Sequence, residues 1–307
     1  GVNEQFLAPD IRYRAVWRRA VRGNSHFMKL AAPRQLHRLV CRRAGFTEGE
    51  FDIEAACLEG PSARVISGCG DPETRLVSWI HSVQGKEEVL SYAFRSFKEA
   101  EECYQKFDHM VFVSDCVMRD FRRLMPGIRR GSVLYNAIES DVIRKKAEER
   151  AGLPEDGLLR LAAVGTLKEV KGYDRLLRAV RAINQERKRV HLYILGEGPL
   201  RGRIEQYVQD HGMEQEVTLL GYQTNPYRYL KQCDLLVCSS YSEGFSTAVS
   251  EALVLGVPVC TTDVSGMKEM LGDGNEYGII TENSEQGLKQ GILKLVEDPE
   301  LLSRYRE

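Results

Sequence analysis

Short apolar runs alternate with helix-length amphipathic segments through the second half of the chain. The runs are rich in β-branched residues and cover 161–164, 190–195, 217–220, 235–238, 257–261 and 278–281. Between most of them, apolar residues recur every three or four positions, as in 173–183, which is typical of a helix with one buried face. Strands that alternate with helices form a parallel sheet covered on both faces. The pattern therefore predicts a doubly wound α/β domain over 158–307.

The first half shows the same alternation less regularly. Its candidate strands cover 51–57, 76–80, 110–113 and 132–135. Its candidate helices cover 84–106 and 115–124. We expect a second Rossmann-like α/β domain over 1–139, joined to the first by a charged helix and linker over 140–157. Ligands of such domains bind at the carboxyl ends of the strands, so a cleft between the two is the expected site.

Composition excludes several classes of protein. The 307 residues include 43 basic and 44 acidic side chains, and this balance gives no indication of a nucleic-acid partner. The longest apolar run, 252–260, contains a glycine and a proline and falls short of the roughly 18 residues of a membrane span, so a soluble protein is expected. The eight cysteines show neither a CxxC pair nor zinc spacing, which favours a reducing cytoplasm and no metal ligands.

The densest polar cluster, 242–252, follows the predicted strand 235–238 and opens a helix. Gly244 permits a tight turn, and Ser246 or Thr247 is a natural N-cap. The exposed amides of a helix start form an anion site suited to a diphosphate.

Two carboxylates flank this anion site, Glu243 before the turn and Glu251 one helical turn after Thr247. Carboxylates repel phosphate but accept hydrogen bonds from the hydroxyls of a ribose or a sugar. Taken alone, Glu243 is more simply interpreted as a solvated loop acid and Glu251 as a residue that interacts with the helix dipole. The cluster as a whole favours a binding site.

A second cluster, 164–174, lies at the carboxyl end of the domain's first predicted strand. Its Lys171 is a candidate point charge for a phosphate, although a lysine before a helix is usually only a surface charge. The glycines of 196–199 fit only part of a dinucleotide fingerprint, because Arg201 occupies the place of the third glycine. This mismatch argues against an NAD-dependent oxidoreductase.

Seven short motifs follow one another through residues 158–300. They are Val164-Gly165-x-Leu167 with Lys171-Gly172, Leu195-Gly196-x-Gly198-Pro199, Leu220-Gly221-Tyr222, Asp234 with Ser239, Glu243-Gly244 with Glu251-Ala252, Gly256-x-Pro258-Val259, and Gly266 with Glu269. In this order they resemble the retaining glycosyltransferases of family 4, the glycosyl transferases group 1. The resemblance implies the GT-B fold, in which two Rossmann-like domains are paired.

The resemblance also implies roles for individual residues. Glu251 would bind the ribose hydroxyls and Glu243 the hydroxyls of the transferred hexose. Lys171 and the amides of a short run would hold the diphosphate; that run is Gly244, Phe245, Ser246 and Thr247. Thr166 occupies a donor-binding position where the family usually has an arginine that helps to neutralise the leaving group, and Lys168 is the candidate replacement. The chain contains no DxD motif, so neither a metal ion nor another cofactor is expected.

The first half resembles the family's acceptor domain more loosely, through Trp79-Ile80-His81, 112–114 and 135–139. A lone histidine after an apolar strand is more often structural than catalytic, but the place of His81 at the carboxyl end of a strand favours the active site. We interpret the other histidines as structural or solvated; they are His26, His37, His109, His191 and His211. The family's first βαβ unit and last helices have no counterpart here, so the first domain is expected to be incomplete.

These observations predict a cytoplasmic, metal-independent retaining glycosyltransferase. It would move a sugar from a nucleoside diphosphate sugar to a hydroxyl of a glycan or lipid-linked acceptor, in the synthesis of a cell-surface polysaccharide or glycolipid. A non-catalytic sugar-nucleotide-binding module remains the alternative, followed by an NAD-dependent oxidoreductase.

Residues 11–43 contain ten basic side chains and no acid, and apolar residues interleave at helical spacing. Such a stretch suits an anionic membrane surface at the inner face of the membrane, where lipid-linked acceptors are found. Helices that pack their apolar faces on the sheet and leave the arginines solvated are the alternative.

Overall fold

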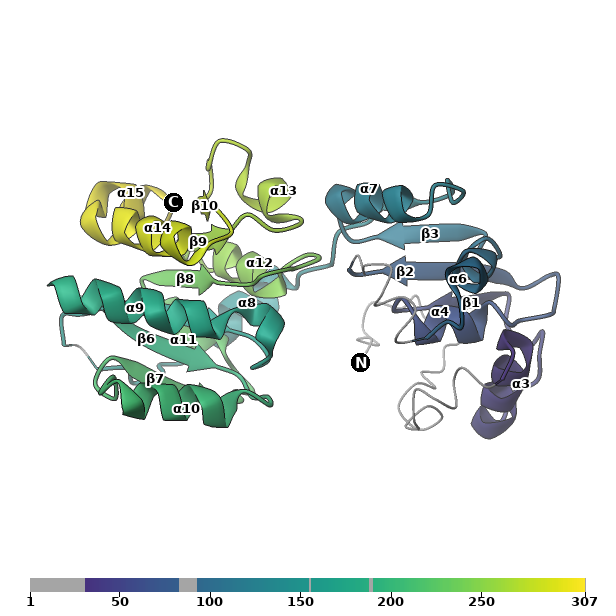
Figure 1. Cartoon of the computed structure of the whole chain (residues 1–307), viewed down its shortest axis with the longest axis horizontal. Helices are drawn as coiled ribbons and strands as arrows, with labels where there is room; N and C mark the ends of the chain where they lie inside the picture. The colour runs from purple at the N-terminus through teal and green to yellow at the C-terminus, as the bar shows by residue number, and fades with distance from the viewer. Residues whose placement is uncertain (1–30, 83–92, 155, 188–189, 307) are drawn as a thin grey trace. The chain divides into compact units, whose positions relative to one another are not determined.

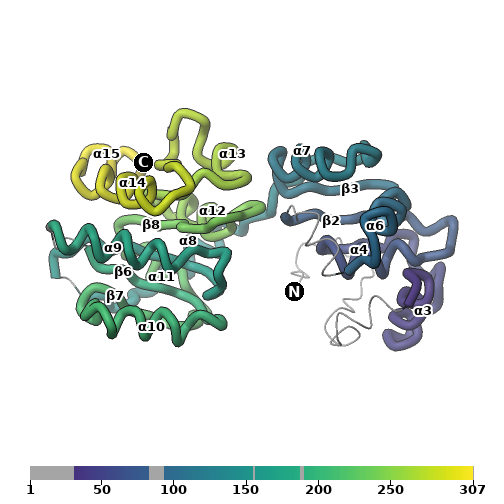
Figure 2. The backbone as a smooth tube through the Cα atoms, viewed as in Figure 1, coloured from purple at the N-terminus to yellow at the C-terminus, as the bar shows by residue number. Residues whose placement is uncertain are grey.

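The computed structural model describes residues 31–82, 93–154, 156–187 and 190–306. The chain forms two compact units. Unit 1 contains the chain up to Val113 together with Val117–Leu134, and unit 2 contains Ser114–Cys116 and the chain from Tyr135 onward. Helices and strands carry the labels of Figure 1, and the tube of Figure 2 follows the same path.

Unit 2 contains a parallel sheet with the strand order β10-β9-β8-β5-β6-β7. The strands are β5 (Leu159–Val164), β6 (Val190–Leu195), β7 (Val217–Gly221), β8 (Leu235–Cys238), β9 (Val259–Thr262) and β10 (Ile279–Thr281). Its described helices and 3₁₀ turn are α8 (Ser140–Ala147), η2 (Glu169–Lys171), α9 (Tyr173–Arg187), α10 (Arg201–Asp210), α11 (Tyr227–Gln232), α12 (Thr247–Val254), α13 (Met267–Leu271), α14 (Glu285–Glu297) and α15 (Pro299–Arg304). The predicted doubly wound sheet is confirmed.

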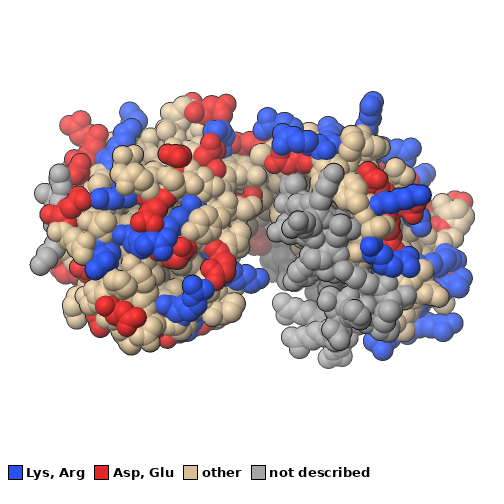
Figure 3. Space-filling model, viewed as in Figure 1, with Lys and Arg blue, Asp and Glu red and all other residues tan. Residues whose placement is uncertain are grey.

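The sheet of unit 2 has an apolar layer on each face. Successive residues of a strand point to opposite faces, so Leu161 and Ala163 of β5 contribute to one layer and Ala162 to the other. The first layer is completed by α9, α10 and α14, and the second by α8, α11 and α12. Ile143 of α8 lies in the second layer, so the segment after residue 139 packs on unit 2. On the face seen in Figure 3, acidic and basic side chains of unit 2 are interspersed.

Unit 1 contains a smaller parallel sheet with the strand order β1-β2-β3-β4. Its elements are β1 (Ile53–Ala56), β2 (Arg75–Ile80), β3 (His109–Phe112), β4 (Ser132–Val133), α3 (Pro33–Ala44), α4 (Pro61–Ile66), α6 (Phe97–Tyr104) and α7 (Asp115–Leu124). The two parallel sheets confirm the predicted α/β class.

In unit 1, the bounds of one predicted helix were wrong and one short helix was missed. The helix predicted over 84–106 begins, in its described part, only at Phe97, because the Ser96 side chain caps it by accepting from the Glu99 amide at 3.1 Å. Helix α4 was not predicted, since six residues are too few to show a helical period. Within the described residues, no helix combines the length and the apolar character needed to cross a bilayer.

Candidate functional site

The candidate site of unit 2 lies where β5 and β8 end. These strands are paired in the sheet, and both are followed by loops at its carboxyl edge. Gly172 has a φ of 63°, and a Cβ there would lie 2.1 Å from the Ser239 carbonyl oxygen, so only glycine lets the loops approach this closely. The Ser239 hydroxyl donates to the Lys171 carbonyl at 2.9 Å and the Tyr241 amide to the Val170 carbonyl at 2.8 Å. The two loops therefore form one braced structure.

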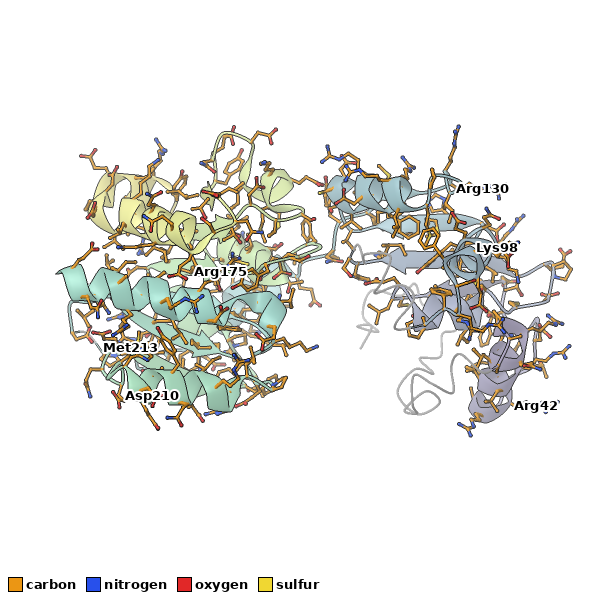
Figure 4. All side chains as sticks on the ribbon, in the orientation of Figure 1. Arg42, Lys98, Arg130, Arg175, Asp210 and Met213 are labelled. Atoms are coloured by element: carbon orange, nitrogen blue, oxygen red, sulfur yellow. The ribbon has the colours of Figure 1, made fainter. Side chains whose placement is uncertain are left out.

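Arg175, which the sequence analysis missed, fixes the second loop from inside the unit. The residue is 2% exposed on α9, and Figure 4 marks its position. Its guanidinium donates to the carbonyls of Ser239 at 2.8 Å and Ser240 at 2.5 Å, and lies 4.0 Å from the centre of the Tyr241 ring. Burial lowers the pKa of Arg175. No motif signals this role, because an arginine on an amphipathic helix ordinarily faces water.

Lys171 and Glu243, predicted as phosphate and sugar ligands, lie side by side. The Lys171 ammonium is 2.5 Å from Oε1 of Glu243, and the Ser240 hydroxyl donates to the same oxygen at 2.7 Å. The two side chains are 28% and 11% exposed. The fold therefore places a cation and a carboxylate at one point, from positions 72 residues apart in the chain.

Helix α12 begins a few residues after Glu243, and its start carries the residues of the predicted anion site. Ser246, not Thr247, is the N-cap, since its hydroxyl accepts from the Val249 amide at 3.5 Å, whereas Thr247 is exposed in the first turn. The turn before the helix is packed closely, because a Cβ on Gly266 would lie 2.7 Å from the Gly244 carbonyl oxygen. Phe245 packs against Tyr135 with ring centres 5.5 Å apart.

Glu251 lies on α12 in a more apolar environment than Glu243. Its Oε1 accepts a hydrogen bond from the Tyr227 hydroxyl at 3.2 Å. Burial raises the pKa of Glu251, and burial together with the nearby carboxylate raises the pKa of Tyr227 to about 12. Tyr227 is a second residue that the sequence analysis missed, because a single tyrosine at the start of a short helix carries no motif.

Thr166 is exposed in the loop after β5, next to the buried Leu167. The Leu167 amide donates to the Glu197 carbonyl at 3.0 Å, and a Cβ on Gly196 would lie 1.9 Å from the Gly165 carbonyl oxygen. The glycine at 196 is thus required for packing one loop on its neighbour.

His81 is the predicted site residue that belongs to unit 1. It directly follows β2, its amide donates to Oε2 of Glu59 at 3.0 Å, and its ring stacks on Trp79 with centres 6.4 Å apart. The Ser82 hydroxyl donates to the other oxygen of Glu59. Glu59, which the sequence analysis missed, therefore fixes the backbone that carries His81.

Known proteins resemble the chain over most of its length. A curated relative from Campylobacter jejuni, named N-acetylgalactosamine-N,N'-diacetylbacillosaminyl-diphospho-undecaprenol 4-alpha-N-acetylgalactosaminyltransferase, is 34% identical over 58% of this chain and 47% of its own length. A relative from Bacillus subtilis, the putative teichuronic acid biosynthesis glycosyltransferase TuaC, is 34% identical over 78% of this chain and 59% of its own. The chain thus spans about half the length of these curated relatives.

The fold also recurs in solved structures. The Anabaena protein Alr3699/HepE, in complex with UDP and glucose, superposes with a TM-score of 0.75 at 20% identity and covers 91% of this chain and 77% of its own. The family model described as Glycosyl transferases group 1 matches residues 145–307, more than half of the chain. The residues of the candidate site in unit 2 lie within this match, and the chain belongs to the glycosyl transferases group 1 family with a GT-B fold.

Proposed function

We propose that this protein transfers a sugar, with retention of anomeric configuration, from a nucleoside diphosphate sugar to an acceptor hydroxyl. The observation that carries the proposal is the Lys171–Glu243 pair, whose glutamate lies a few residues before the start of α12. This arrangement brings a cation, a carboxylate and the first amides of a helix together. The cation and the helix amides suit a diphosphate, and the carboxylate suits the hydroxyls of a sugar.

The pair explains how one site serves both ends of the donor. A lysine ammonium has three N–H donors, so Lys171 can bind Glu243 and still donate to a phosphate oxygen. The ion pair also holds the Glu243 carboxylate in place and reduces its repulsion of a phosphate. Lys171 and the amides of 244–247 would then stabilise the charge that develops on the departing diphosphate.

The remaining predicted residues complete the proposal. Glu251 accepts from the ribose hydroxyls, with Tyr227 orienting its carboxylate at 3.2 Å. Thr166 lies in the donor loop after β5, and His81 acts at the reacting sugar. We propose that donor binding requires no metal ion, since an ammonium and helix amides supply the positive charge.

The proposed donor and acceptor of this protein are inferred from the names of its relatives. The Campylobacter jejuni relative is named for a diphospho-undecaprenol acceptor and the Bacillus subtilis relative for teichuronic acid biosynthesis, and the Anabaena structure contains UDP and glucose. We therefore propose a UDP-sugar as donor, a glycan or lipid-linked acceptor, and a role in polysaccharide or glycolipid synthesis at the inner face of the membrane.

A donor panel tests this proposal. Thermal unfolding is measured with UDP-, GDP- and ADP-sugars and with NAD, because a ligand that binds the folded state raises the midpoint. We expect a rise with UDP-sugars and none with NAD, and a rise with GDP- or ADP-sugars alone would contradict the proposed donor. The donor that binds is then incubated with candidate acceptors, with and without added Mg²⁺ or Mn²⁺, and the product's anomeric configuration is read by NMR.

Each outcome of this experiment discriminates. Transfer with retained configuration and no need for added cations supports the proposal. Binding without transfer to any acceptor favours the non-catalytic binding module, and an inverted product or a strict cation requirement contradicts the mechanism.

A further inference from the structure

A mixed cluster of metal-binding side chains lies in unit 1. His37 comes from α3, Glu54 from β1, and Cys69 from the turn that follows α4. One potential ligand atom from each of the three lies within 4.8 Å of the other two. The His37 and Glu54 side chains are 2% and 12% exposed, and His37 Nε2 lies 2.7 Å from Glu54 Oε2. Three separate elements therefore converge on one point.

A fourth donor lies next to this group. Cys41 follows His37 by one turn of α3, is buried, and has its Sγ 3.7 Å from each ring nitrogen of His37. Glu48 approaches the other side of the ring, with its Oε1 3.9 Å from Nδ1. The cluster thus offers one imidazole, two thiols and a carboxylate.

We propose that His37, Glu54 and Cys69 bind a zinc ion that fastens α3 to the rest of unit 1, with Cys41 as the nearest candidate for a fourth ligand. Thiolate and imidazole ligands together favour Zn²⁺ over the hard cations Mg²⁺ and Ca²⁺. Zinc bond lengths of about 2.0–2.3 Å give ligand-to-ligand distances of roughly 3.3–3.8 Å in a tetrahedral site. The His37–Glu54 contact of 2.7 Å would therefore lengthen when the ion binds.

The apolar contacts of α3 indicate how such an ion would stabilise the fold. Among the described residues, the small apolar cluster under α3 has only two buried members, Leu36 and Val65, with Ala31 and Val40 packed against them. A helix with so few apolar contacts gains little from burial, whereas structural zinc sites contribute folding free energy directly. Figure 1 shows α3 and α4 as neighbours in unit 1, and the cluster joins them to β1.

This inference departs from the absence of metal ligands expected from the sequence. The four positions lack the paired spacing of zinc fingers, and only His37 and Cys41 are close enough in the chain to suggest a site. The residues of the proposed donor site all lie elsewhere in the chain, so the two proposals stand or fall independently.

The experiment uses the chain purified in metal-free buffer and titrated with Zn²⁺, and with Co²⁺ as a spectroscopic probe. We expect one bound zinc per chain, a higher unfolding midpoint with Zn²⁺, and a thiolate-to-cobalt charge-transfer band. Cys69→Ser should weaken zinc affinity at least tenfold and reduce the cobalt band, because loss of a direct ligand costs at least as much as loss of an outer-shell partner. Cys57→Ser, which removes an exposed cysteine, is the matched control and should bind as the parent does.

A second variant protects the test against a folding defect. Glu54→Gln keeps a hydrogen-bonding group beside His37 but replaces the anionic ligand, and it should also bind zinc more weakly. The proposal is overturned if zinc produces no thermal shift, or if Cys69→Ser and Glu54→Gln bind zinc and cobalt as the parent does.

Discussion

Units 1 and 2 both contain a parallel sheet, yet they use charged side chains in opposite ways. In unit 2, apolar layers cover both faces of the sheet, and the Lys171–Glu243 pair lies at the edge where loops leave it. In unit 1, Arg64 is 0% exposed and donates to Glu99 at 2.9 Å within the buried part of the unit. We propose that the first pair binds a ligand, whereas the second is part of the internal packing.

The comparison shows why a buried charge is not by itself a sign of function. Removing one partner of a buried pair leaves an uncompensated charge and costs about 3–5 kcal/mol, whereas a partly exposed pair costs far less. Arg175 of unit 2 is an instructive exception, because it is buried but bound to loop carbonyls beside the site. We therefore expect that removing a charge of the Arg64–Glu99 pair destabilises unit 1, whereas removing a charge of the Lys171–Glu243 pair impairs ligand binding by unit 2.

The largest effect is expected for Glu99→Gln. The Glu99 carboxylate accepts from Arg64 at 2.9 Å and from Arg95 at 2.6 Å, and its replacement leaves a buried guanidinium without its counter-charge. We expect a loss of about 3–5 kcal/mol in the free energy of unfolding, measured by urea denaturation. Glu102→Gln on the same helix, whose side chain is 60% exposed, is the control and should change stability by less than about 1 kcal/mol. Similar losses in both variants would remove the contrast between the units.

The same carboxylate predicts a dependence of stability on pH. Burial opposes ionisation of Glu99, but hydrogen bonds from Arg64 and Arg95 outweigh it and lower the pKa from 4.5 to about 2. The stabilisation is therefore fully present above about pH 4.5 and is lost as the pH falls toward 2. Because one pKa unit is worth about 1.4 kcal/mol, the loss amounts to about 3 kcal/mol. Urea titrations should show the stability gap between the parent and Glu99→Gln narrowing in that window, and a constant gap would contradict the assignment.

In unit 2, Lys171→Ala should impair function more than stability. One charge-assisted contact to the diphosphate is worth roughly 1.5–3 kcal/mol, so kcat/KM should fall at least about tenfold. Lys289→Ala, which removes a surface lysine paired with Glu186, is the matched control and should leave kcat/KM unchanged. Equal kinetics for the parent and Lys171→Ala would exclude the phosphate role.

The two glutamates of unit 2 sharpen the comparison within one site. Glu243→Gln should lower turnover more than affinity for the nucleoside diphosphate, because the residue is proposed to contact the sugar. Glu251→Ala should weaken binding of the nucleoside diphosphate itself, and Tyr227→Phe should do so to a smaller extent by releasing the carboxylate it orients. Calorimetric titration with the nucleoside diphosphate separates these roles, and equal affinities for the Glu243 and Glu251 variants would show that the roles are wrongly divided.

The sequence predicted the elements of unit 2 well because local pattern and global fold agree there. Every predicted strand of that half corresponds to an observed strand, and the motif residues Lys171 and Glu243 meet although they are 72 positions apart. The closeness of the two loops could be predicted, because neighbouring parallel strands end at the same edge of the sheet. The direct ion pair between Lys171 and Glu243 could not be predicted, because the distance between the side chains depends on the turn at Gly172.

Other features left no trace in the pattern. The buried contacts of Arg64 and Arg175 contradict the usual exposure of arginine, so periodicity assigns both to water. The cluster around His37 joins residues from three elements, and its spacing matches no motif. Such features become visible only when the chain is folded, because they depend on contacts between distant segments.

The smallest effect per side chain is predicted for the basic stretch 11–43, of which residues 11–30 lie outside the described part of the chain. In the described part, Leu36 of α3 packs on Val65, as expected of a helix that packs within its unit, while Arg42 and Arg43 are exposed. Exposed arginines can still attract an anionic surface, at about 1 kcal/mol each. We therefore predict salt-sensitive co-sedimentation with anionic vesicles.

Replacing both arginines by glutamine should weaken that binding by roughly ten- to thirtyfold, since two contacts of about 1 kcal/mol are lost. The double variant Lys294→Gln/Arg304→Gln removes the same charge from exposed positions of unit 2 and should bind as the parent does. If the two double variants lose binding equally, the attraction follows net charge rather than α3. If the parent binds anionic and neutral vesicles equally poorly, the proposed attraction of α3 to a membrane surface is excluded, and packing within unit 1 accounts for its apolar face.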